Sequence, residues 1–173
     1  MKTAILGLGA SLSLYNPSDF DLAIGVNDIW RYHQPDAIVC LNHRSTFNYD
    51  RLRYIDDSTP KAFYTQIANW SVRPDYVKID LTPYFPAADM NLDQVQIYKS
   101  YCSPFVACQI ALRYYAATEV HLFGVDLIAH PHLDRSLCLK IKNHFRLLSE
   151  ALNKIGVRFI VHGEGILKDL FVY

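Results

Sequence analysis

The sequence has no excess of charge of either sign. It contains 17 lysines and arginines and 17 aspartates and glutamates, which leaves a formal net charge of zero at pH 7. Proteins that bind nucleic acids or anionic membrane surfaces usually concentrate positive charge in a patch or stripe. We therefore expect no nucleic acid as a partner and no polybasic contact with a membrane.

The N-terminus also lacks a long hydrophobic run. Residues 1–12 contain one lysine and only a short apolar stretch, which suits a buried strand better than a signal peptide or a membrane span. We expect no membrane span and a cytoplasmic protein.

Paired cysteines are absent as well. Cys40, Cys102, Cys108 and Cys138 form no CxxC pair, and three of the four lie inside apolar runs, where a thiol behaves as a small hydrophobic group. This pattern predicts reduced, structural thiols rather than disulfides.

What is present is enough apolar sequence for one core. Half of the 173 residues are hydrophobic, and a chain of this length can bury about 70% of its unfolded surface. No internal repeat, low-complexity tract or linker divides it. We expect one domain over residues 1–173.

Short apolar runs predict the strands of this domain. They lie at 3–6, 22–26, 37–41 and 120–123, with further strands expected at 61–65, 76–81 and 158–161. Runs with little alternation are typical of strands buried on both faces. With helices expected over 48–57, 103–117 and 137–155, the sequence predicts an α/β fold with a mostly parallel sheet. A short terminal helix is expected after residue 163.

The central helix has a clear start. Ser103 is a good N-cap and Pro104 suits the first helical position. Between Phe105 and Ala117 only Gln109 and Arg113 are polar apart from the tyrosine hydroxyls, so this helix is expected to be packed on several sides.

Small and polar residues follow four of the predicted strands. They are Gly7, Asn27, Asn42 and, after the strand at 120–123, Gly124 and Asp126. Ligands of parallel sheets bind at the carboxyl ends of the strands, which makes this edge the predicted binding site. The alternative is that Asn and Asp are present because they favour turns.

The first of these strand ends is the segment Gly7-Leu8-Gly9-Ala10-Ser11. Two glycines and a serine after a strand allow a tight turn whose N–H groups can approach a phosphate. The segment lacks the third glycine of a dinucleotide fingerprint, and a tight turn without a ligand is the alternative interpretation.

Two histidines follow the predicted strand at 120–123. His130 and His132 lie near Asp126 and Asp134, where an imidazole can act as a general base near neutral pH. Two alternating histidines without a marked third ligand are poor evidence for zinc, so we predict no metal site there. A solvated loop without a chemical role remains an alternative. His121, which alternates with apolar residues, is expected to be a satisfied core or surface residue and not a catalyst.

These segments, taken in order, resemble the motifs of bacterial sialyltransferases that use a CMP-sugar donor. The matching segments are Gly7-Leu8-Gly9-Ala10-Ser11-Leu12, Gly25-Val26-Asn27, Leu41-Asn42, and the stretch from Ser103 to Gly124-Val125-Asp126-Leu127. The wider superfamily of Rossmann-like proteins related to hydroxymethylpterin pyrophosphokinases shares them. The resemblance implies a single three-layer Rossmann-like domain.

The resemblance also implies roles for individual residues. Gly7, Gly9 and Ser11 would lie beside the nucleotide, and Gly124 and Asp126 would form the floor of the same cleft. Asn27 and Asn42 would reach the phosphate or ribose of the donor. Ser103 would start the helix that faces the phosphate, a role that the positive end of a helix dipole independently favours.

Two departures from the family pattern stand out. Leu8 replaces an asparagine and Ala10 replaces a proline, so one donor hydrogen bond is lost. The family places its catalytic histidine in a long lid, whereas here only about ten residues follow Leu127 before the last long helix, a length typical of an ordinary connection. His130 or His132 could fill that role.

Three functions follow from this pattern. The first is a glycosyltransferase that uses a nucleotide-sugar donor of the CMP type, transfers to a glycan acceptor and needs no metal cofactor. The second is a magnesium-dependent phosphotransferase like the pyrophosphokinases, with Asp28 and Asp126 as metal ligands. The third is a non-catalytic nucleotide-binding accessory protein. Relatives often form homo-oligomers, with which an aromatic content of 13% is compatible.

Overall fold

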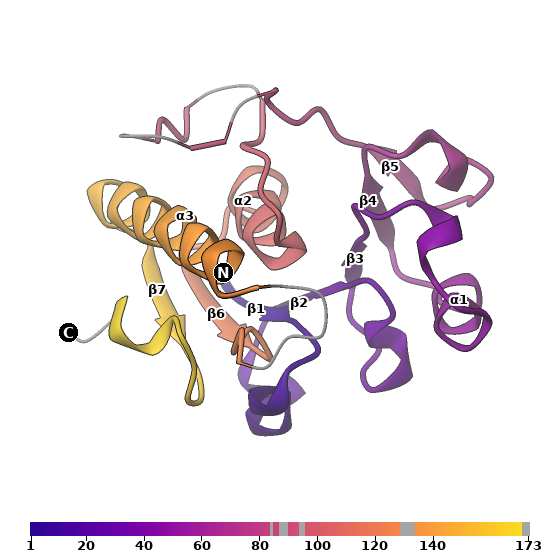
Figure 1. Cartoon of the computed structure of the whole chain (residues 1–173), viewed down its shortest axis with the longest axis horizontal. Helices are drawn as coiled ribbons and strands as arrows, with labels where there is room; N and C mark the ends of the chain where they lie inside the picture. Colours follow the sequence, from indigo (N-terminus) through magenta and orange to yellow (C-terminus); the bar gives the residue numbers. More distant parts are fainter. Residues whose placement is uncertain (84, 87–89, 94–95, 129–133, 171–173) are drawn as a thin grey trace.

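A parallel β-sheet forms the centre of the molecule (Figure 1). The computed structural model describes residues 1–83, 85–86, 90–93, 96–128 and 134–170, and in these residues the sheet has seven strands, all parallel to their neighbours. In spatial order the strands are β5 (Tyr76–Lys78), β4 (Ala62–Thr65), β3 (Ala37–Val39), β2 (Leu22–Val26), β1 (Lys2–Leu6), β6 (Glu119–Phe123) and β7 (Arg158–Val161). The predicted α/β fold with a parallel sheet is confirmed.

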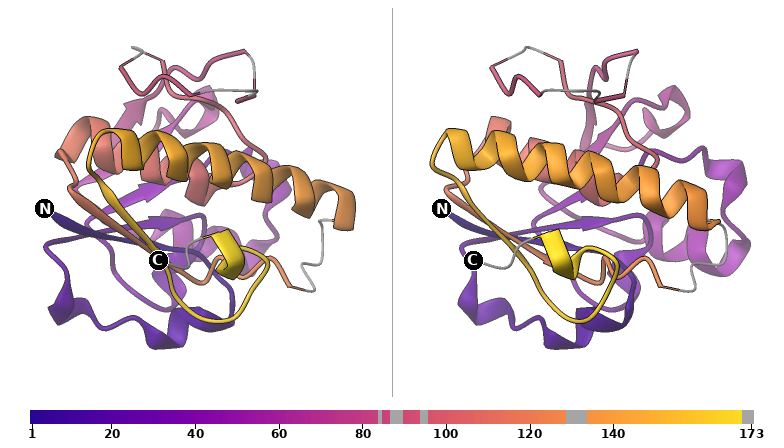
Figure 2. Two further views of the ribbon diagram at one scale, coloured as in Figure 1. Left: turned by 90° about the vertical axis from the view of Figure 1, so that its left-hand side faces the viewer. Right: turned by 60° about the vertical axis from the view of Figure 1, so that its left-hand side comes forward.

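The helices cover the sheet unequally. α2 (Ser103–Tyr115) and α3 (Arg135–Lys154) lie on one face, side by side (Figure 2). The other face is covered by α1 (Tyr49–Asp56) and short 3₁₀ segments, including Ala10–Leu14 and Ile29–Arg31. None of the helices in the described residues combines the length and apolarity that a membrane crossing requires.

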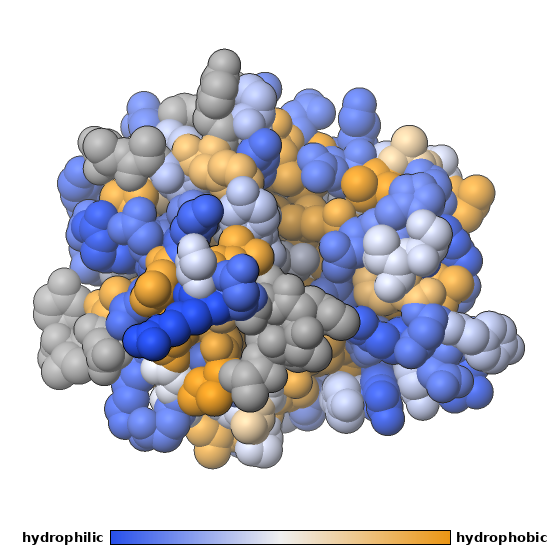
Figure 3. Space-filling model, viewed as in Figure 1, coloured by the Kyte–Doolittle hydropathy of each residue, from blue (hydrophilic) through white to orange (hydrophobic). Residues whose placement is uncertain are grey.

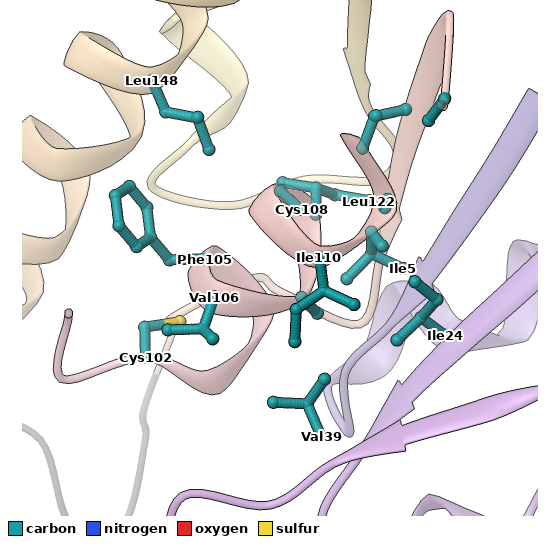
Figure 4. Close-up of a cluster of buried hydrophobic side chains, with 14 of the residues drawn as sticks. Ile5, Ile24, Val39, Cys102, Phe105, Val106, Cys108, Ile110, Leu122 and Leu148 are labelled. Atoms are coloured by element: carbon teal, nitrogen blue, oxygen red, sulfur yellow. The ribbon is translucent and has the colours of Figure 1, made fainter. Parts of the chain in front are cut away.

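Two clusters of buried side chains hold these layers together. The larger one lies under α2 and α3 and includes Ile5, Ile24, Val39, Phe105, Ile110, Leu122 and Leu148 (Figure 4). The second lies on the opposite face and includes Leu6, Ile38, Phe63 and Trp70. Adjacent residues of one strand belong to different clusters because side chains alternate between the faces of a sheet. The four cysteines are buried and free.

The helix starts differ slightly from those predicted. The carbonyl of Cys102 accepts the first turn's hydrogen bond from the Phe105 N–H at 3.1 Å, so Cys102 is the N-cap of α2 and Ser103 is the first helical residue. The prediction of Ser103 as N-cap is therefore wrong by one position. α3 starts at Arg135 instead of Leu137, because the Asp134 carboxylate accepts from the Leu137 N–H at 2.7 Å and caps the helix.

Two strands are shorter than predicted. β3 ends at Val39 instead of Leu41, although the Cys40 N–H still bonds to the Tyr64 carbonyl at 3.0 Å. β5 ends at Lys78 instead of Leu81, which forms only an isolated bridge with Ile97. The apolar residues of each run predicted a longer strand, but a strand can extend only as far as its neighbour continues to pair with it.

Hydrophilic and hydrophobic residues are interspersed over the face of the molecule that α3 crosses (Figure 3). This mixture is ordinary for a protein surface, since apolar atoms contribute more than half of the accessible area of a folded chain.

Candidate functional site

The candidate site lies at the carboxyl edge of the sheet. The strand order reverses beside β1: the chain moves outward from β1 to β5 and then returns to place β6 on the other side of β1. In open α/β sheets such a reversal leaves room for a ligand at the strand ends. The segments after β1, β2, β3 and β6, which hold the predicted site residues, all begin at this edge.

A buried hydrogen-bonded hub, formed by Ser11, Gly124 and Asp126, joins the segments after β1 and β6. The Ser11 hydroxyl donates to Oδ1 of Asp126, and the Ser11 N–H donates to Oδ2 at 3.0 Å. The Gly124 N–H in turn donates to the Ser11 hydroxyl at 2.8 Å. The structure thus brings these three predicted residues together, and their polar groups form hydrogen bonds with one another.

The two glycines after β1 fit closely against this hub. The N–H groups of Gly7 and Gly9 donate to the carbonyls of Phe123 at 2.7 Å and of Gly124 at 2.8 Å. A Cβ on Gly9 would lie 2.4 Å from Asp126 Oδ2 and 2.9 Å from the Gly124 carbonyl oxygen, so the hub would have to shift to admit it. The backbone N–H groups that the sequence suggested for a phosphate therefore have partners inside the chain.

The C-terminal segment that packs against the hub was not predicted from the sequence. After β7 the chain curls back beside the segment that follows β1 (Figure 2). The Ile166 N–H donates to the Asp126 carbonyl at 3.0 Å, and a Cβ on Gly165 would lie 2.6 Å from the same oxygen. A Cβ on Gly163 would lie 2.3 Å from Cβ of Ser11. The only signal in the sequence was the closely spaced pair of glycines.

Asn27 and Asn42 come together at the ends of β2 and β3. Nδ2 of Asn42 lies 3.5 Å from Oδ1 of Asn27, at the outer limit of a hydrogen bond. Asn27 is half-buried and has a φ of 53°, a left-handed conformation that asparagine tolerates better than most residues. Asn42 is exposed, and its carbonyl accepts from Nε1 of Trp70 at 2.9 Å. The two side-chain amides form a small polar surface at the predicted edge.

Ser103 stands at the start of α2, away from the amino edge of the sheet, because the other end of α2 leads into β6 at that edge, where the Thr118 N–H donates to the Met1 carbonyl at 2.9 Å. Its hydroxyl has no hydrogen-bond partner among the described residues. The first N–H groups of a helix lack intrahelical acceptors and attract anions. Ser103 is therefore the first residue of this helix, one position after the N-cap that the sequence predicted.

The two carboxylates considered as magnesium ligands already have partners. Asp28 is buried and accepts from Nε and Nη2 of Arg51 at 3.0 and 2.5 Å. Both oxygens of Asp126 accept from Ser11. Within the described part of the chain, no group of three or more His, Cys, Asp or Glu residues is placed to hold a metal ion.

The two predicted catalytic histidines, His130 and His132, lie outside the described residues. Of their predicted neighbours, Asp126 belongs to the hub and Asp134 is the N-cap of α3.

A hollow of about 400 Å³ opens beside the segment after β1. Leu8, Gly9, Ala10, Leu12, Ser13, Tyr32 and His33 line it. Leu8, which replaces an asparagine of the family pattern, is 37% exposed and places an apolar side chain on its wall. A ligand in this hollow would meet mostly apolar surface and the two aromatic rings.

A cluster of polar side chains joins β6 and β7 on the sheet face that points away from α2 and α3. Nε2 of His121 lies 2.6 Å from Oε1 of Glu119, and Nδ1 lies 2.7 Å from Nε2 of His162. A carboxylate only accepts, so neutral His121 carries its proton on Nε2 and accepts at Nδ1 from His162. His121 is buried, which is one of the two positions that the sequence allowed, and its partners could not be read from the sequence.

Burial lowers the pKa of three histidines. For His121, His162 and His144 the largest cause is desolvation, which disfavours the charged form; in His121 it outweighs the opposing effect of Glu119. The Glu119 carboxylate, which bonds to His121 and pairs with Arg158, has a lowered pKa instead.

We expect these histidines to make the protein less stable below neutral pH. A lowered folded pKa means that the unfolded chain binds more protons, so stability is complete above about pH 6.5 and falls as the pH decreases below that value, by up to about 1.4 kcal/mol per unit for each group. Urea denaturation between pH 8 and pH 5 measures the slope. His144→Asn removes one of the three titrating groups and should reduce the slope.

The parallel sheet, its reversal beside β1 and the polar groups at its carboxyl edge define the chain as a Rossmann-like α/β protein. No family model matches the sequence, and no curated protein matches it. Among solved structures, the chain is similar to an X-ray structure of a mutant of the alpha-2,3/8-sialyltransferase CstII, with a TM-score of 0.55 and 14% identity over 100% of this chain and 89% of that one. At this identity the similarity shows a shared fold.

Proposed function

We propose that the protein is a glycosyltransferase that uses a nucleotide-sugar donor, with a CMP-sugar as the first candidate. The main support is the meeting of Asn27 and Asn42 at the carboxyl edge of the sheet, in a fold shared with a sialyltransferase. Fold alone does not define function, but the two amides lie at the edge where this class of fold binds its ligand.

In this proposal the phosphate of the donor lies between the two asparagines and the start of α2. The amide of Asn27 donates to the leaving phosphate, and the first N–H groups of α2 with the Ser103 hydroxyl supply further donors. Fixed donors of this kind stabilise the negative charge that develops on a leaving group. Gly7, Gly9, Ser11, Gly124 and Asp126 shape the floor, because their own polar groups are used within the hub.

The transfer step requires a base. The acceptor hydroxyl attacks the anomeric carbon, the bond from that carbon to the phosphate oxygen breaks, and the nucleotide leaves with the electron pair. His130 or His132 takes the proton of the acceptor hydroxyl, as an imidazole can near neutral pH. The proposed mechanism needs no metal ion, since the leaving group is stabilised by protein donors.

The test is nucleotide binding measured by thermal shift and calorimetry. We expect CMP to raise the melting temperature with or without magnesium, and Asn27→Ala to weaken CMP binding by about tenfold, the worth of one hydrogen bond to a charged group. Asn143→Ala, at an exposed position on α3, is the matched control and should bind as the unmodified chain does.

Three outcomes would contradict the proposal. No shift with any nucleotide at millimolar concentration would exclude the donor site. Binding that requires magnesium would favour the phosphotransferase instead. Binding of CMP-sugars without transfer or hydrolysis, unchanged by replacing both His130 and His132 with glutamine, would favour a non-catalytic accessory protein.

A further inference from the structure

Asp28, which follows Asn27 directly, is held by a fork of hydrogen bonds from α1. Both of its carboxylate oxygens accept from the guanidinium of Arg51, and the Asp28 side chain is only 5% exposed. Two parallel hydrogen bonds fix the relative orientation of the two planar groups, which one bond would not do. The carboxylate of Asp28 therefore has one defined position.

Arg51 itself is fixed from two other directions. Its N–H donates at 3.0 Å to the side chain of Asn48, the N-cap of α1. Its guanidinium lies over the ring of Phe47, with 5.1 Å between Cζ and the ring centroid. The hydrogen bond to Asp28 is also the largest cause of a raised pKa at Arg51, so the guanidinium stays charged. The first turn of α1 thus provides a rigid support for Asp28.

Asn27, the residue before Asp28, has a left-handed backbone conformation. Asn27 has a φ of 53°, in the left-handed region, which costs most residues with a Cβ about 1–2 kcal/mol and asparagine less. Its N–H is bonded to the Val39 carbonyl at 3.1 Å, which holds the turn on the side of β3. Strained residues persist when their surroundings hold them in place. On the other side of Asn27 the chain is held at the next residue, because Arg51 fixes the Asp28 carboxylate.

From this geometry we propose that Arg51 is a positioning residue that orients the amide of Asn27 toward the donor phosphate through the carboxylate of Asp28. The inference rests on the proposed function, in which Asn27 contacts the phosphate. Arg51 does not touch the substrate in this account. Its second effect is to neutralise Asp28, whose charge would otherwise repel an anionic ligand at the neighbouring amide.

Two substitutions separate these effects. Arg51→Lys keeps the positive charge but replaces the planar fork with a single ammonium, whereas Arg51→Gln removes the charge as well. Positioning predicts that both weaken CMP binding by about tenfold, and neutralisation alone predicts that Arg51→Lys binds normally. Arg53→Gln, on the same helix and exposed, is the matched control and should change binding by less than about twofold.

A double-mutant cycle decides whether Arg51 acts through Asn27. In the Asn27→Ala background, Arg51→Lys should weaken CMP binding by less than about twofold, because the amide that it positions is gone. Equal losses in both backgrounds would mean that Arg51 contacts the ligand itself, and would overturn the proposal. Normal binding by Arg51→Lys with Asn27 present would also overturn it.

A measurement without nucleotide keeps this proposal separate from the proposed function. In ¹H–¹⁵N spectra of the ligand-free chain, Arg51→Lys should shift the side-chain amide signals of Asn27 and Asn42, and Arg53→Gln should leave them in place. The Asn27→Ala spectrum identifies the Asn27 signals. If the unmodified chain binds no nucleotide, the proposed function fails, and unchanged amide signals in Arg51→Lys would then overturn the positioning role too.

Discussion

Replacing Gly124 by alanine is expected to lower the free energy of unfolding by about 3 kcal/mol or more. Among the substitutions that add one methyl group, this is the largest effect that we predict. Gly124 has a φ of 67°, and a Cβ there would lie 2.6 Å from the carbonyl oxygen of Gly7 and 3.0 Å from the Gly9 nitrogen. Both obstacles are backbone atoms, which cannot turn aside as a side chain would. The segments after β1 and β6 would have to separate, and the hub would lose its hydrogen bonds.

Gly156 provides the matched control for this prediction. Its φ of 74° is nearly the same, but no heavy atom lies within 4 Å of the position that a Cβ would take. Gly156→Ala should therefore cost only the strain of the left-handed conformation, about 1–2 kcal/mol. Chemical denaturation of both variants measures the difference. Equal losses would show that the contact between the two segments contributes nothing beyond backbone strain.

Asp126→Ala is expected to destabilise the fold by about 2–4 kcal/mol and to weaken nucleotide binding. The substitution leaves the Ser11 N–H and hydroxyl, which are buried, without their acceptor, and an unsatisfied buried donor costs more than its hydrogen bond contributed. The hub then no longer fixes the segment after β1. Denaturation curves and CMP titration measure the two effects.

Asp134→Ala is the control for this substitution. Asp134 also accepts one backbone N–H, that of Leu137, but it is exposed and caps α3 instead of linking two segments. Losing a cap costs about 1 kcal/mol, because water replaces the lost acceptor. If Asp126→Ala were no more destabilising than Asp134→Ala, the hub would not be a stabilising element of the site.

The sequence was informative wherever a pattern was local. Apolar runs located all seven strands, and the polar residues after β1, β2, β3 and β6 were correctly placed at one edge, since parallel strands end on the same side. The resemblance to sialyltransferases anticipated a fold that a solved sialyltransferase structure shares. Element ends were less certain: Ser103 proved to be the first residue of α2 and not its N-cap, because a carbonyl of the preceding residue closes the first turn.

The partners of the polar groups could not be predicted in the same way. Ser11 and Asp126 are far apart in the chain, and either could have faced a ligand; only the packing of β1 beside β6 shows that they bond to each other. The same holds for Asp28, which the sequence offered as a metal ligand and which the fold pairs with Arg51 from α1. Charge and residue type are local properties, whereas partners depend on distance in three dimensions.

By itself the sequence determined the class of fold and the residues that stand at the carboxyl edge of the sheet, because the periodicity of apolar residues and the chemistry of turns act over a few neighbouring positions. Only the tertiary structure decided which of those residues form hydrogen bonds within the chain and which keep polar groups free for a ligand. Hydrogen bonds between Ser11, Gly124 and Asp126 join the segments after β1 and β6. The fold also brings Asn27 and Asn42 together and pairs Arg51 with Asp28. Hydrogen bonds between distant segments require that the whole sheet be assembled first, which no local pattern specifies.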